Sequence, residues 1–435
     1  MSAETYDNAV DRPGEAGVVR SQVRAIAAAG VGNVLEWYDF TVYAYLAGIL
    51  STKFFVTGNE STALLATFAV FGVGFVARPL GGLLIGLFGD KYGRKPALLL
   101  TFLMIAGSTG LMGILPTYAS IGIAAPLLLV LARLLQGISA GGEWGGAASF
   151  LVEWAPAHRR GLYGSLHPCA ITLGMLLGSG VTGALTSTLG SATMADWGWR
   201  IPFLLGALLG PVGLYVRSKV DETPIFQRTK RAPEAAALKD FSMARTMLLA
   251  FAFPAVQSVV TYISVGYFST FTQKYAGLTP AAALWSTSLA TLVMGLSSLG
   301  SGWLSDKTGR KFNMLLACAL LVLLSYPLLS LALGSGTPWV VIMTQSIFTA
   351  FCGLFLGGMP AALVEMFPTA RRLTGLTTAY NIQSMVFGGF APFIASWLIV
   401  ETGAPISLSY FIIASAAISG LALLMMAETS RKALP

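Results

Sequence analysis

Charged side chains are scarce in this chain of 435 residues. Lys, Arg, Asp and Glu make up only 11% of the sequence, against about 25% in an ordinary soluble domain. Hydrophobic residues make up 55%, and the mean hydropathy is +0.72. These residues supply too little polar surface for a soluble enzyme and too little charge for a disordered chain. The composition therefore predicts an integral membrane protein.

Residues that hold metals or act as nucleophiles are also few. The chain has two histidines and three cysteines. The cysteines lie singly within apolar stretches, and the histidines lack the spacing of a metal site. No Walker-type loop or HExxH string appears. We therefore expect no metal, no cofactor other than a proton as coupling ion, and no enzyme.

Apolar stretches recur through the whole sequence. A spanning helix needs about 20 apolar residues, and these stretches are too long, and lack the alternation, for strands of an outer-membrane barrel. The sequence predicts an all-α membrane protein with twelve transmembrane helices, at residues 25–50, 62–88, 96–115, 124–153, 162–187, 199–217, 246–275, 281–304, 311–333, 338–366, 373–400 and 405–427.

Lys and Arg concentrate in the tails, in the central loop and in alternate short loops. The positive-inside rule then predicts a multi-pass protein of the cell inner (plasma) membrane with both termini in the cytoplasm. This distribution accounts for the net charge of +8, so we expect the lipid bilayer, and no nucleic acid, as the partner of the basic face.

The second half of the chain repeats the first. GDKYGRK at 89–95 returns as SDKTGRK at 305–311, and EWAPAHRR at 153–160 returns as EMFPTARR at 365–372. Repeats of this size predict two six-helix bundles with a substrate site between them. The predicted parts are a tail at 1–24, a bundle at 25–217, a linker at 218–245, a bundle at 246–427 and a tail at 428–435.

The motifs resemble those of a known family. GLFGDKYGRK and GWLSDKTGRK resemble the signature loop of the major facilitator superfamily, and RLLQGISAGGEWGG resembles its helix-4 motif. GNVLEWYDFTVYAYL and WGWRIPF resemble the metabolite:proton symporter family within it, whose members carry citrate, 2-oxoglutarate, shikimate, proline and betaines. The resemblance implies two pseudo-symmetric six-helix bundles that work by alternating access.

The resemblance also implies gating contacts in the repeated loops. The residues concerned are Asp90, Gly93 and Arg94 in the first half, and Asp306, Gly309 and Arg310 in the second. We expect matching contacts of Glu153 with Arg159, and of Glu365 with Arg371. The alternative is that these residues serve only as turn residues and positive anchors.

Five charged residues lie in the interior of predicted spans, away from the span ends, and all five are in the first half: Glu36, Asp39, Arg78, Arg133 and Glu143. Charges inside a membrane are costly and mark functional sites. We expect the three acids to take part in proton coupling, Asp39 first, and the two arginines to bind a carboxylate in a bidentate manner. Permanent ion pairs between helices are the competing interpretation.

Polar and aromatic residues complete the predicted substrate site. They are Asn33, Tyr38, Tyr43, Gln136, His167, Tyr267, Asn381 and Gln383. Each of them also suits a simple hydrogen bond between helices.

We therefore expect a monomeric secondary active transporter that moves a small organic acid, such as citrate or 2-oxoglutarate, together with protons. The alternatives are symport of a zwitterion (proline or betaine), symport of shikimate or an aromatic acid, and a proton-independent facilitator. A membrane-embedded enzyme, a nutrient sensor and a channel are disfavoured, because the chain has no catalytic motif, no large cytoplasmic segment and two repeated gating loops.

Overall fold

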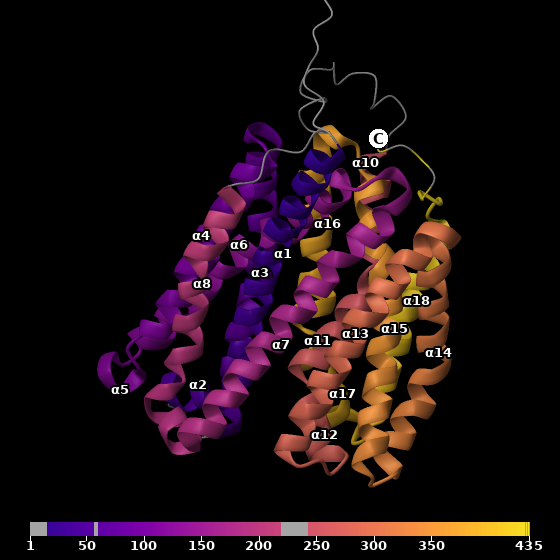
Figure 1. Cartoon of the computed structure of the whole chain (residues 1–435). Helices are drawn as coiled ribbons and strands as arrows, with labels where there is room; N and C mark the ends of the chain where they lie inside the picture. The colour runs from indigo at the N-terminus through magenta and orange to yellow at the C-terminus, as the bar shows by residue number, and fades with distance from the viewer. Residues whose placement is uncertain (1–14, 56–59, 219–241, 431, 433, 435) are drawn as a thin grey trace, which may run out of the picture.

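The computed structural model describes residues 15–55, 60–218, 242–430, 432 and 434. All secondary structure in these residues is helical. Figure 1 shows the helices of the first half and those of the second half as two groups that lie side by side. The predicted tail at 1–24 and the predicted linker at 218–245 fall mostly outside the described residues.

The first group holds α1 to α8. Their bounds are α1 Glu15–Tyr45, α2 Ala47–Phe54, α3 Glu60–Tyr92, α4 Arg94–Ile114, the short α5 Tyr118–Ile121, α6 Ala124–Trp154, α7 Arg160–Thr193 and α8 Arg200–Ser218. The second group holds α10 Met243–Ala252, α11 Ala255–Gly266, α12 Phe268–Tyr275, α13 Pro280–Thr308, α14 Arg310–Gly334, α15 Pro338–Met366, α16 Arg372–Gln383, α17 Ala391–Thr402 and α18 Ser407–Met425.

Each of the twelve predicted spans is mostly helical where it is described. Among the described residues, nine helical segments are long and apolar enough to cross a membrane. The other three predicted spans are α1, α8 and α13. The all-α fold predicted from the sequence is confirmed.

Three predicted spans are interrupted. Residues 25–50 form α1 and α2, which are separated at Leu46. Residues 246–275 form three helices, α10, α11 and α12, with breaks at Phe253–Pro254 and at Tyr267. Proline lacks a backbone N–H, which favours the first break. Residues 373–400 form α16 and α17 with a π-helical turn, Ser384–Gly389, between them. Such turns often occur at functional sites.

Glycines let α3 and α6 cross closely. A Cβ added to Gly137 would lie 2.0 Å from the carbonyl oxygen of Gly74, and one added to Gly141 would lie 2.2 Å from that of Arg78. Small residues at such crossings are typical of membrane helices. The close approach brings the two arginine-bearing helices together.

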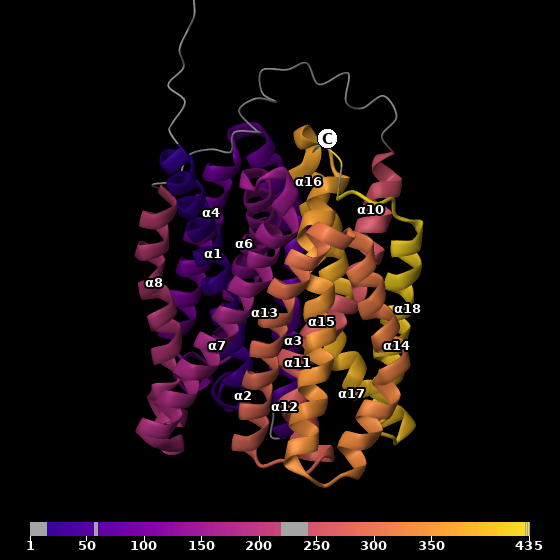
Figure 2. The same ribbon diagram turned by 45° about the vertical axis from the view of Figure 1, so that its right-hand side comes forward.

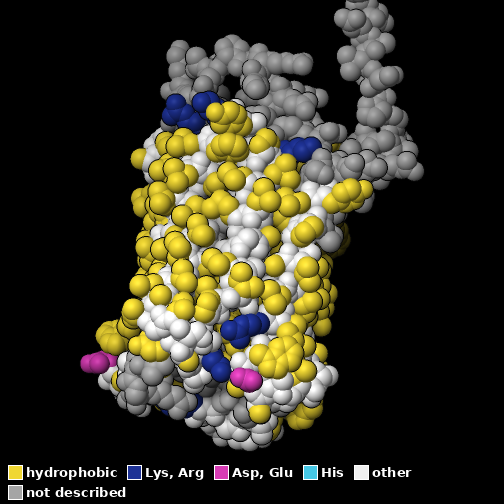
Figure 3. All heavy atoms as spheres, turned by 90° about the vertical axis from the view of Figure 1, so that its left-hand side faces the viewer, with side chains coloured by type: hydrophobic (Ala, Val, Ile, Leu, Met, Phe, Trp, Pro, Cys, Tyr) yellow, Lys and Arg dark blue, Asp and Glu magenta, His cyan; other side chains and the backbone are white. Residues whose placement is uncertain are grey.

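Apolar side chains cover the middle of the surface. On the face shown in Figure 3, hydrophobic side chains form a broad band, and charged side chains lie towards the two ends of the molecule. The exposed side chains include leucines of α3, α4 and α6, such as Leu83, Leu87, Leu103 and Leu131. The pattern is that of a lipid-facing surface.

The glycine crossing yields a stability prediction. Gly137→Ala places a methyl group against the backbone of α3 and should lower stability by about 1–3 kcal/mol, as overpacked cores do. Gly107→Ala in α4 is the control, because nothing lies within 4 Å of its added Cβ. Thermal unfolding in detergent followed by size-exclusion chromatography measures both. Equal melting temperatures for the two variants would contradict the close crossing.

Candidate functional site

Glu36 of α1 and Arg78 of α3 form a buried ion pair. Nη2 of Arg78 lies 3.1 Å from Oε1 of Glu36, and the two side chains are 1% and 2% exposed. Removing either charge would leave the other buried without its counter-charge. The Nε–H of Arg78 has no hydrogen-bond partner among the described residues, so the guanidinium retains a free donor.

Aromatic rings from both halves surround Arg78. Its guanidinium carbon lies 4.7 Å from the ring centroid of Phe40 and 4.5 Å from that of Phe75. Nη1 donates to the Tyr262 hydroxyl across 3.4 Å, from the first half of the chain to the second. The Tyr262 ring stacks on Trp37 with centroids 5.5 Å apart. We call Glu36, Trp37, Phe75, Arg78 and Tyr262 the central site.

Arg133 of α6 is buried without an ion pair among the described residues. Its guanidinium carbon lies 4.0 Å from the ring centroid of Tyr43, 5.1 Å from that of Phe40 and 5.0 Å from that of Phe71. One nitrogen donates to Gln136, while Nε and Nη2 have no partner in the described part of the chain. Cation–π contacts thus replace part of its hydration.

Asp39 lies within electrostatic range of Arg133 but does not bond to it. Its Oδ2 accepts a hydrogen bond of 2.6 Å from the Thr109 hydroxyl, and Oδ1 has no partner among the described residues. A buried carboxylate with one unpartnered oxygen and a cation nearby is suited to exchange a proton.

Glu143 of α6 makes a hydrogen bond to another helix. Its Oε2 accepts 2.8 Å from the Thr101 hydroxyl of α4, so the residue ties α6 to α4. The burial predicted for all five charged residues is confirmed: each is at most 2% exposed.

The second half of the chain contributes hydroxyl, amide and ring groups near the central site. Tyr380 of α16 stacks on Trp144 of α6 with centroids 3.8 Å apart, and it lies within electrostatic range of Arg78 and Glu36. Gln383 accepts 3.2 Å from Ser258, and its Nε2 has no partner among the described residues.

Two predicted tyrosine ligands take part in hydrogen bonds within the first half. The Tyr38 hydroxyl donates to the Pro202 carbonyl at 2.8 Å, and the Tyr43 hydroxyl donates to the Thr67 carbonyl at 3.1 Å. Tyr43 still contacts Arg133 with its ring. Both hydroxyls therefore have the interhelical role given above as the alternative.

The remaining predicted ligands are buried in several places. Asn381 donates to the Gly141 carbonyl across the two halves, and His167 packs edge-on against Trp144 with centroids 4.9 Å apart. Tyr267 lies at the break between α11 and α12. Asn33 is fully buried in α1, and Gln136 accepts from Arg133.

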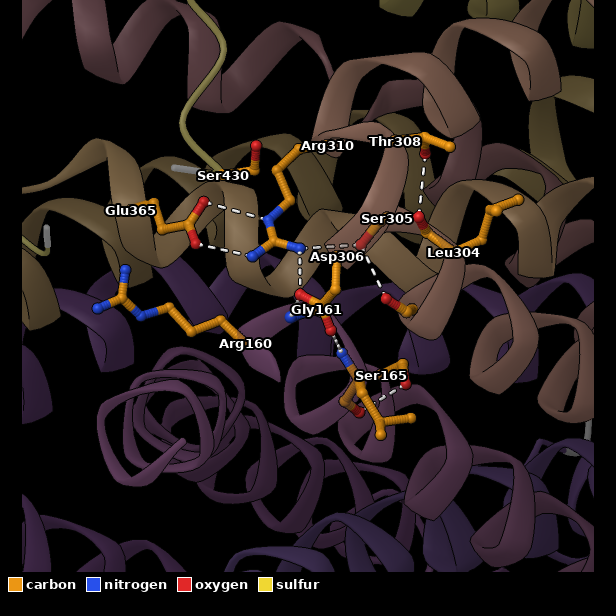
Figure 4. Close-up of polar contacts among 12 residues, drawn as sticks. Arg160, Gly161, Ser165, Leu304, Ser305, Asp306, Thr308, Arg310, Glu365 and Ser430 are labelled. Carbon is orange, nitrogen blue, oxygen red and sulfur yellow. Dashed lines mark hydrogen bonds and ion pairs between the residues drawn. The ribbon is translucent and has the colours of Figure 1, made fainter. Parts of the chain in front are cut away.

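The repeated loops gather at one end of the molecule, which we call the motif end and which comprises residues 89–95, 153–160, 305–311 and 365–372. It lies at the top of Figures 1 and 2, beside the last described residues. Asp306 accepts from the backbone N–H groups of Gly161 at 2.7 Å and Leu162 at 2.9 Å, at the start of α7 (Figure 4). A carboxylate at a helix N-terminus is stabilised by the unpaired N–H groups there.

The first repeat makes the equivalent contact. Asp90 accepts from the backbone N–H of Thr374 at 3.1 Å and from its hydroxyl, at the start of α16. Each half therefore caps a helix of the other half with its repeated aspartate. These contacts join the two halves at the motif end.

Three ion pairs lie at the motif end. Arg310 pairs with Glu365 at 3.0 Å and with Asp306 at 2.8 Å (Figure 4). Glu153 pairs with Arg372 of the other half at 2.9 Å. The sequence analysis expected Glu153 to contact Arg159 and Glu365 to contact Arg371. The side chains of Arg159 and Arg371 are exposed, whereas the next arginine in each loop, Arg160 or Arg372, is buried.

Glycine permits the turn in both loops. Gly93 has φ 118° and Gly309 has φ 96°, a region that residues with a side chain rarely adopt. A Cβ on Gly309 would also lie 2.8 Å from Oε2 of Glu428. The Arg94 side chain lies outside the described part of the structure.

The C-terminal segment also contacts the motif end. Glu428 accepts from the backbone N–H groups of Arg310 at 2.9 Å and Lys311 at 3.1 Å. Partial burial would raise the pKa of this carboxyl, but these donors outweigh it and hold the pKa below its ordinary value. The hydroxyl of Thr429 donates to Glu365, and Arg160 donates to the Lys432 carbonyl.

The aromatic members of the central site, Trp37, Phe75 and Tyr262, were missed by the sequence analysis, and so were Trp144 and Tyr380 near it. Trp37 and Phe75 lie in helices that contain several other aromatic residues. A ring that packs on a neighbouring helix and a ring that faces a substrate have the same sequence pattern, so only the position of Trp37 beside Glu36 was a signal.

The chain matches two family descriptions. Residues 25–240 match "Sugar (and other) transporter", and residues 267–434 match "Major Facilitator Superfamily".

Several proteins are similar over nearly the whole chain. The ectoine/proline transporter ProP of Corynebacterium glutamicum is 37% identical over 428 residues, which cover 94% of this chain and 85% of that protein. The inner membrane metabolite transport protein YhjE of Escherichia coli is 35% identical, covering 96% of both. A putative proline/betaine transporter of Staphylococcus aureus is 35% identical, covering 92% of this chain and 86% of the relative.

Among solved structures, the proton:xylose symporter XylE bound to 6-bromo-6-deoxy-D-glucose has a TM-score of 0.80 at 19% identity, covering 96% of this chain and 98% of XylE. An inward open conformation of XylE from Escherichia coli has a TM-score of 0.69 at 20% identity, covering 95% and 98%. These likenesses show the fold.

The motif-end contacts yield a second prediction. Asp306→Asn weakens the two charge-assisted hydrogen bonds to α7, so the motif end should open more often. Ser165→Cys, placed in a background without Cys169, Cys318 and Cys352, reports this as a severalfold faster alkylation of the buried thiol. Glu401→Gln, which alters an exposed acid, is the control. Unchanged alkylation in the Asp306 variant would show that this carboxylate does not hold the end closed.

Proposed function

The chain belongs to the major facilitator superfamily and is a multi-pass membrane transporter, and from this premise we propose that it carries a small zwitterion, such as proline or a betaine, together with protons. The observation that carries the proposal is the Glu36–Arg78 ion pair at the contact between the two halves. One buried site thus offers both signs of charge to a solute that carries both.

The surroundings of the ion pair suit the two ends of a zwitterion. A carboxylate matches the guanidinium of Arg78, whose Nε–H is unpartnered among the described residues. A secondary or quaternary ammonium suits the carboxylate of Glu36 and the ring faces of Trp37 and Phe75. The names of the relatives, which include ectoine, proline and betaine, support the same class of solute.

A di- or tricarboxylate, which the sequence analysis placed first, receives less support. Glu36 and Asp39 balance Arg78 and Arg133 in formal charge, so a multiply charged anion would meet no net positive charge there. None of the relatives reported above is named for citrate or 2-oxoglutarate. We therefore place the organic acid second.

Asp39 is the proton carrier in this proposal. Its carboxylate faces Thr109 and lies within electrostatic range of Arg133, so gaining or losing a proton changes the field on a buried cation. Glu36 has a different task, because it is the counter-charge of Arg78. Glu143, bound to Thr101, is the second candidate for the proton.

Alternating access follows from the contacts between the halves. The aspartate caps at the motif end must break before the central site can open on that side. The proposed setting is the inner membrane, as for the YhjE relative, with both termini in the cytoplasm and the transporter acting as a monomer without a cofactor.

Uptake into proteoliposomes tests the proposal. Proline, glycine betaine and ectoine should accumulate when the outside is acidified, whereas citrate and 2-oxoglutarate should not. Accumulation of the carboxylates alone would restore the organic-acid interpretation. Uptake of zwitterions without any effect of the proton gradient would leave a facilitator.

Arg78→Gln should raise the Kd of the zwitterion at least about 10-fold, because a charge-assisted hydrogen bond contributes about 1.5–3 kcal/mol. Arg200→Gln is the control, since Arg200 also lies over an aromatic ring, that of Trp199, but outside the central site. Isothermal titration of the purified variants measures both. An unchanged Kd for Arg78→Gln would remove Arg78 from the site.

Asp39→Asn should retain exchange of labelled zwitterion between equal pools, because exchange needs no net proton movement. It should lose accumulation driven by a proton gradient, because the amide carries no exchangeable charge. Asp196→Asn, at an exposed position, serves for comparison. Full accumulation by the Asp39 variant would move the coupling to another acid, Glu143 first.

A further inference from the structure

Tyr262 is the one side chain of the central site that belongs to the second half of the chain. Its ring is 3% exposed and stands between two rings of the first half. It stacks on Trp37, and it meets Phe75 edge to face with centroids 4.9 Å apart. A Cβ on Gly388 would lie 2.6 Å from the Tyr262 ring, so a glycine at this position leaves room for the ring.

The hydroxyl of Tyr262 lies where a solute carboxylate would bind. It accepts from Nη1 of Arg78 at 3.4 Å, longer than the usual 2.9–3.0 Å of an N–H···O bond. A carboxylate forms shorter and stronger bonds to a guanidinium than a neutral hydroxyl does. The contact is therefore one that an arriving carboxylate can replace.

We propose that Tyr262 occupies the place of the solute in this conformation. Its ring fills the space beside Trp37 and Phe75, and its hydroxyl accepts the Arg78 hydrogen bond that the solute carboxylate would accept. The zwitterion displaces the side chain when it binds. This inference rests on the proposed function, because it assumes that the solute uses Arg78 and these two rings. It makes Tyr262 a positioning residue that links binding to the movement of its helix.

The helix that carries Tyr262 is suited to such a movement. α11 is a segment of 12 residues between the breaks at Phe253–Pro254 and at Tyr267. Breaks in backbone hydrogen bonding are where helices bend or rotate. Withdrawal of the ring from between Trp37 and Phe75 would remove the contact with Arg78 that joins the halves and would shift α11 as one unit.

Tyr262→Phe tests the displacement directly. The ring stays, but the hydroxyl that competes for Arg78 is gone, so the zwitterion should bind about three- to tenfold more tightly, the worth of one lost hydrogen bond in the empty transporter. Tyr380→Phe is the matched control, because Tyr380 lies near Arg78 without a hydrogen bond to it in the described structure. Its affinity should equal that of the wild type.

Affinity that is unchanged or weakened in Tyr262→Phe would overturn the proposal. If the Tyr262 hydroxyl only stabilised the packing and did not compete with the solute for Arg78, its removal would not tighten binding. The KM of proteoliposome uptake should fall together with the Kd, which separates tighter binding from faster transport. Both measurements require that a zwitterion binds the wild type.

A second readout applies if no zwitterion binds the wild type, in which case the proposed function fails by itself. Tyr262→Gly vacates the space of the ring, so benzoate, with its ring beside Trp37 and its carboxylate on Arg78, should raise the melting temperature of this variant. The wild type and Tyr380→Gly should not respond. Absence of a benzoate effect in Tyr262→Gly would then overturn the occupancy of the site by Tyr262.

Discussion

A guanidinium buried inside a membrane protein persists only if its charge and its N–H groups are met by other groups. Arg78 meets this requirement with a carboxylate from α1, with two phenylalanine rings and with a tyrosine hydroxyl from the other half of the chain. The same requirement explains the site. These groups hold the Arg78 guanidinium in place but leave its Nε–H without a partner among the described residues. A carboxylate can therefore bind there.

The central site and the motif end are connected by the helices that carry both. α3 carries Arg78 in its middle and Asp90 near its end, and α16 carries Thr374 at its start and Tyr380 further along. Because α3 and α16 meet through the Asp90 cap and through the hydrogen bond from Thr377 to the Gly82 carbonyl, opening of the motif end must alter the packing at the centre. This connection gives alternating access a physical route.

Most of the fold follows from the sequence, because a bilayer allows few solutions for long apolar segments. The helical spans and the burial of Glu36, Asp39 and Arg133 were predicted from hydropathy alone, and both are confirmed. The helix breaks at Pro254 and at the π-helical turn were not predicted. Hydropathy does not register a local change in backbone hydrogen bonding.

Partners across the two halves were the least predictable feature. The repeat placed Glu153 and Glu365 correctly at one end, but their arginine partners, Arg372 and Arg310, depend on which side chains face inwards after the halves meet. In the sequence, Tyr262 is one of several polar residues in a mostly apolar stretch. Its contact with Arg78 joins residues far apart in the chain, so the sequence gives no sign of it.

The most direct measurement of the central claim is an experimental structure of the transporter with glycine betaine bound, because this zwitterion has a carboxylate and a quaternary ammonium that density can distinguish. We expect the carboxylate on Arg78, the ammonium beside Glu36 and the ring of Trp37, and Tyr262 withdrawn from between Trp37 and Phe75. Betaine bound elsewhere, with the Glu36–Arg78–Tyr262 contacts intact, would contradict it.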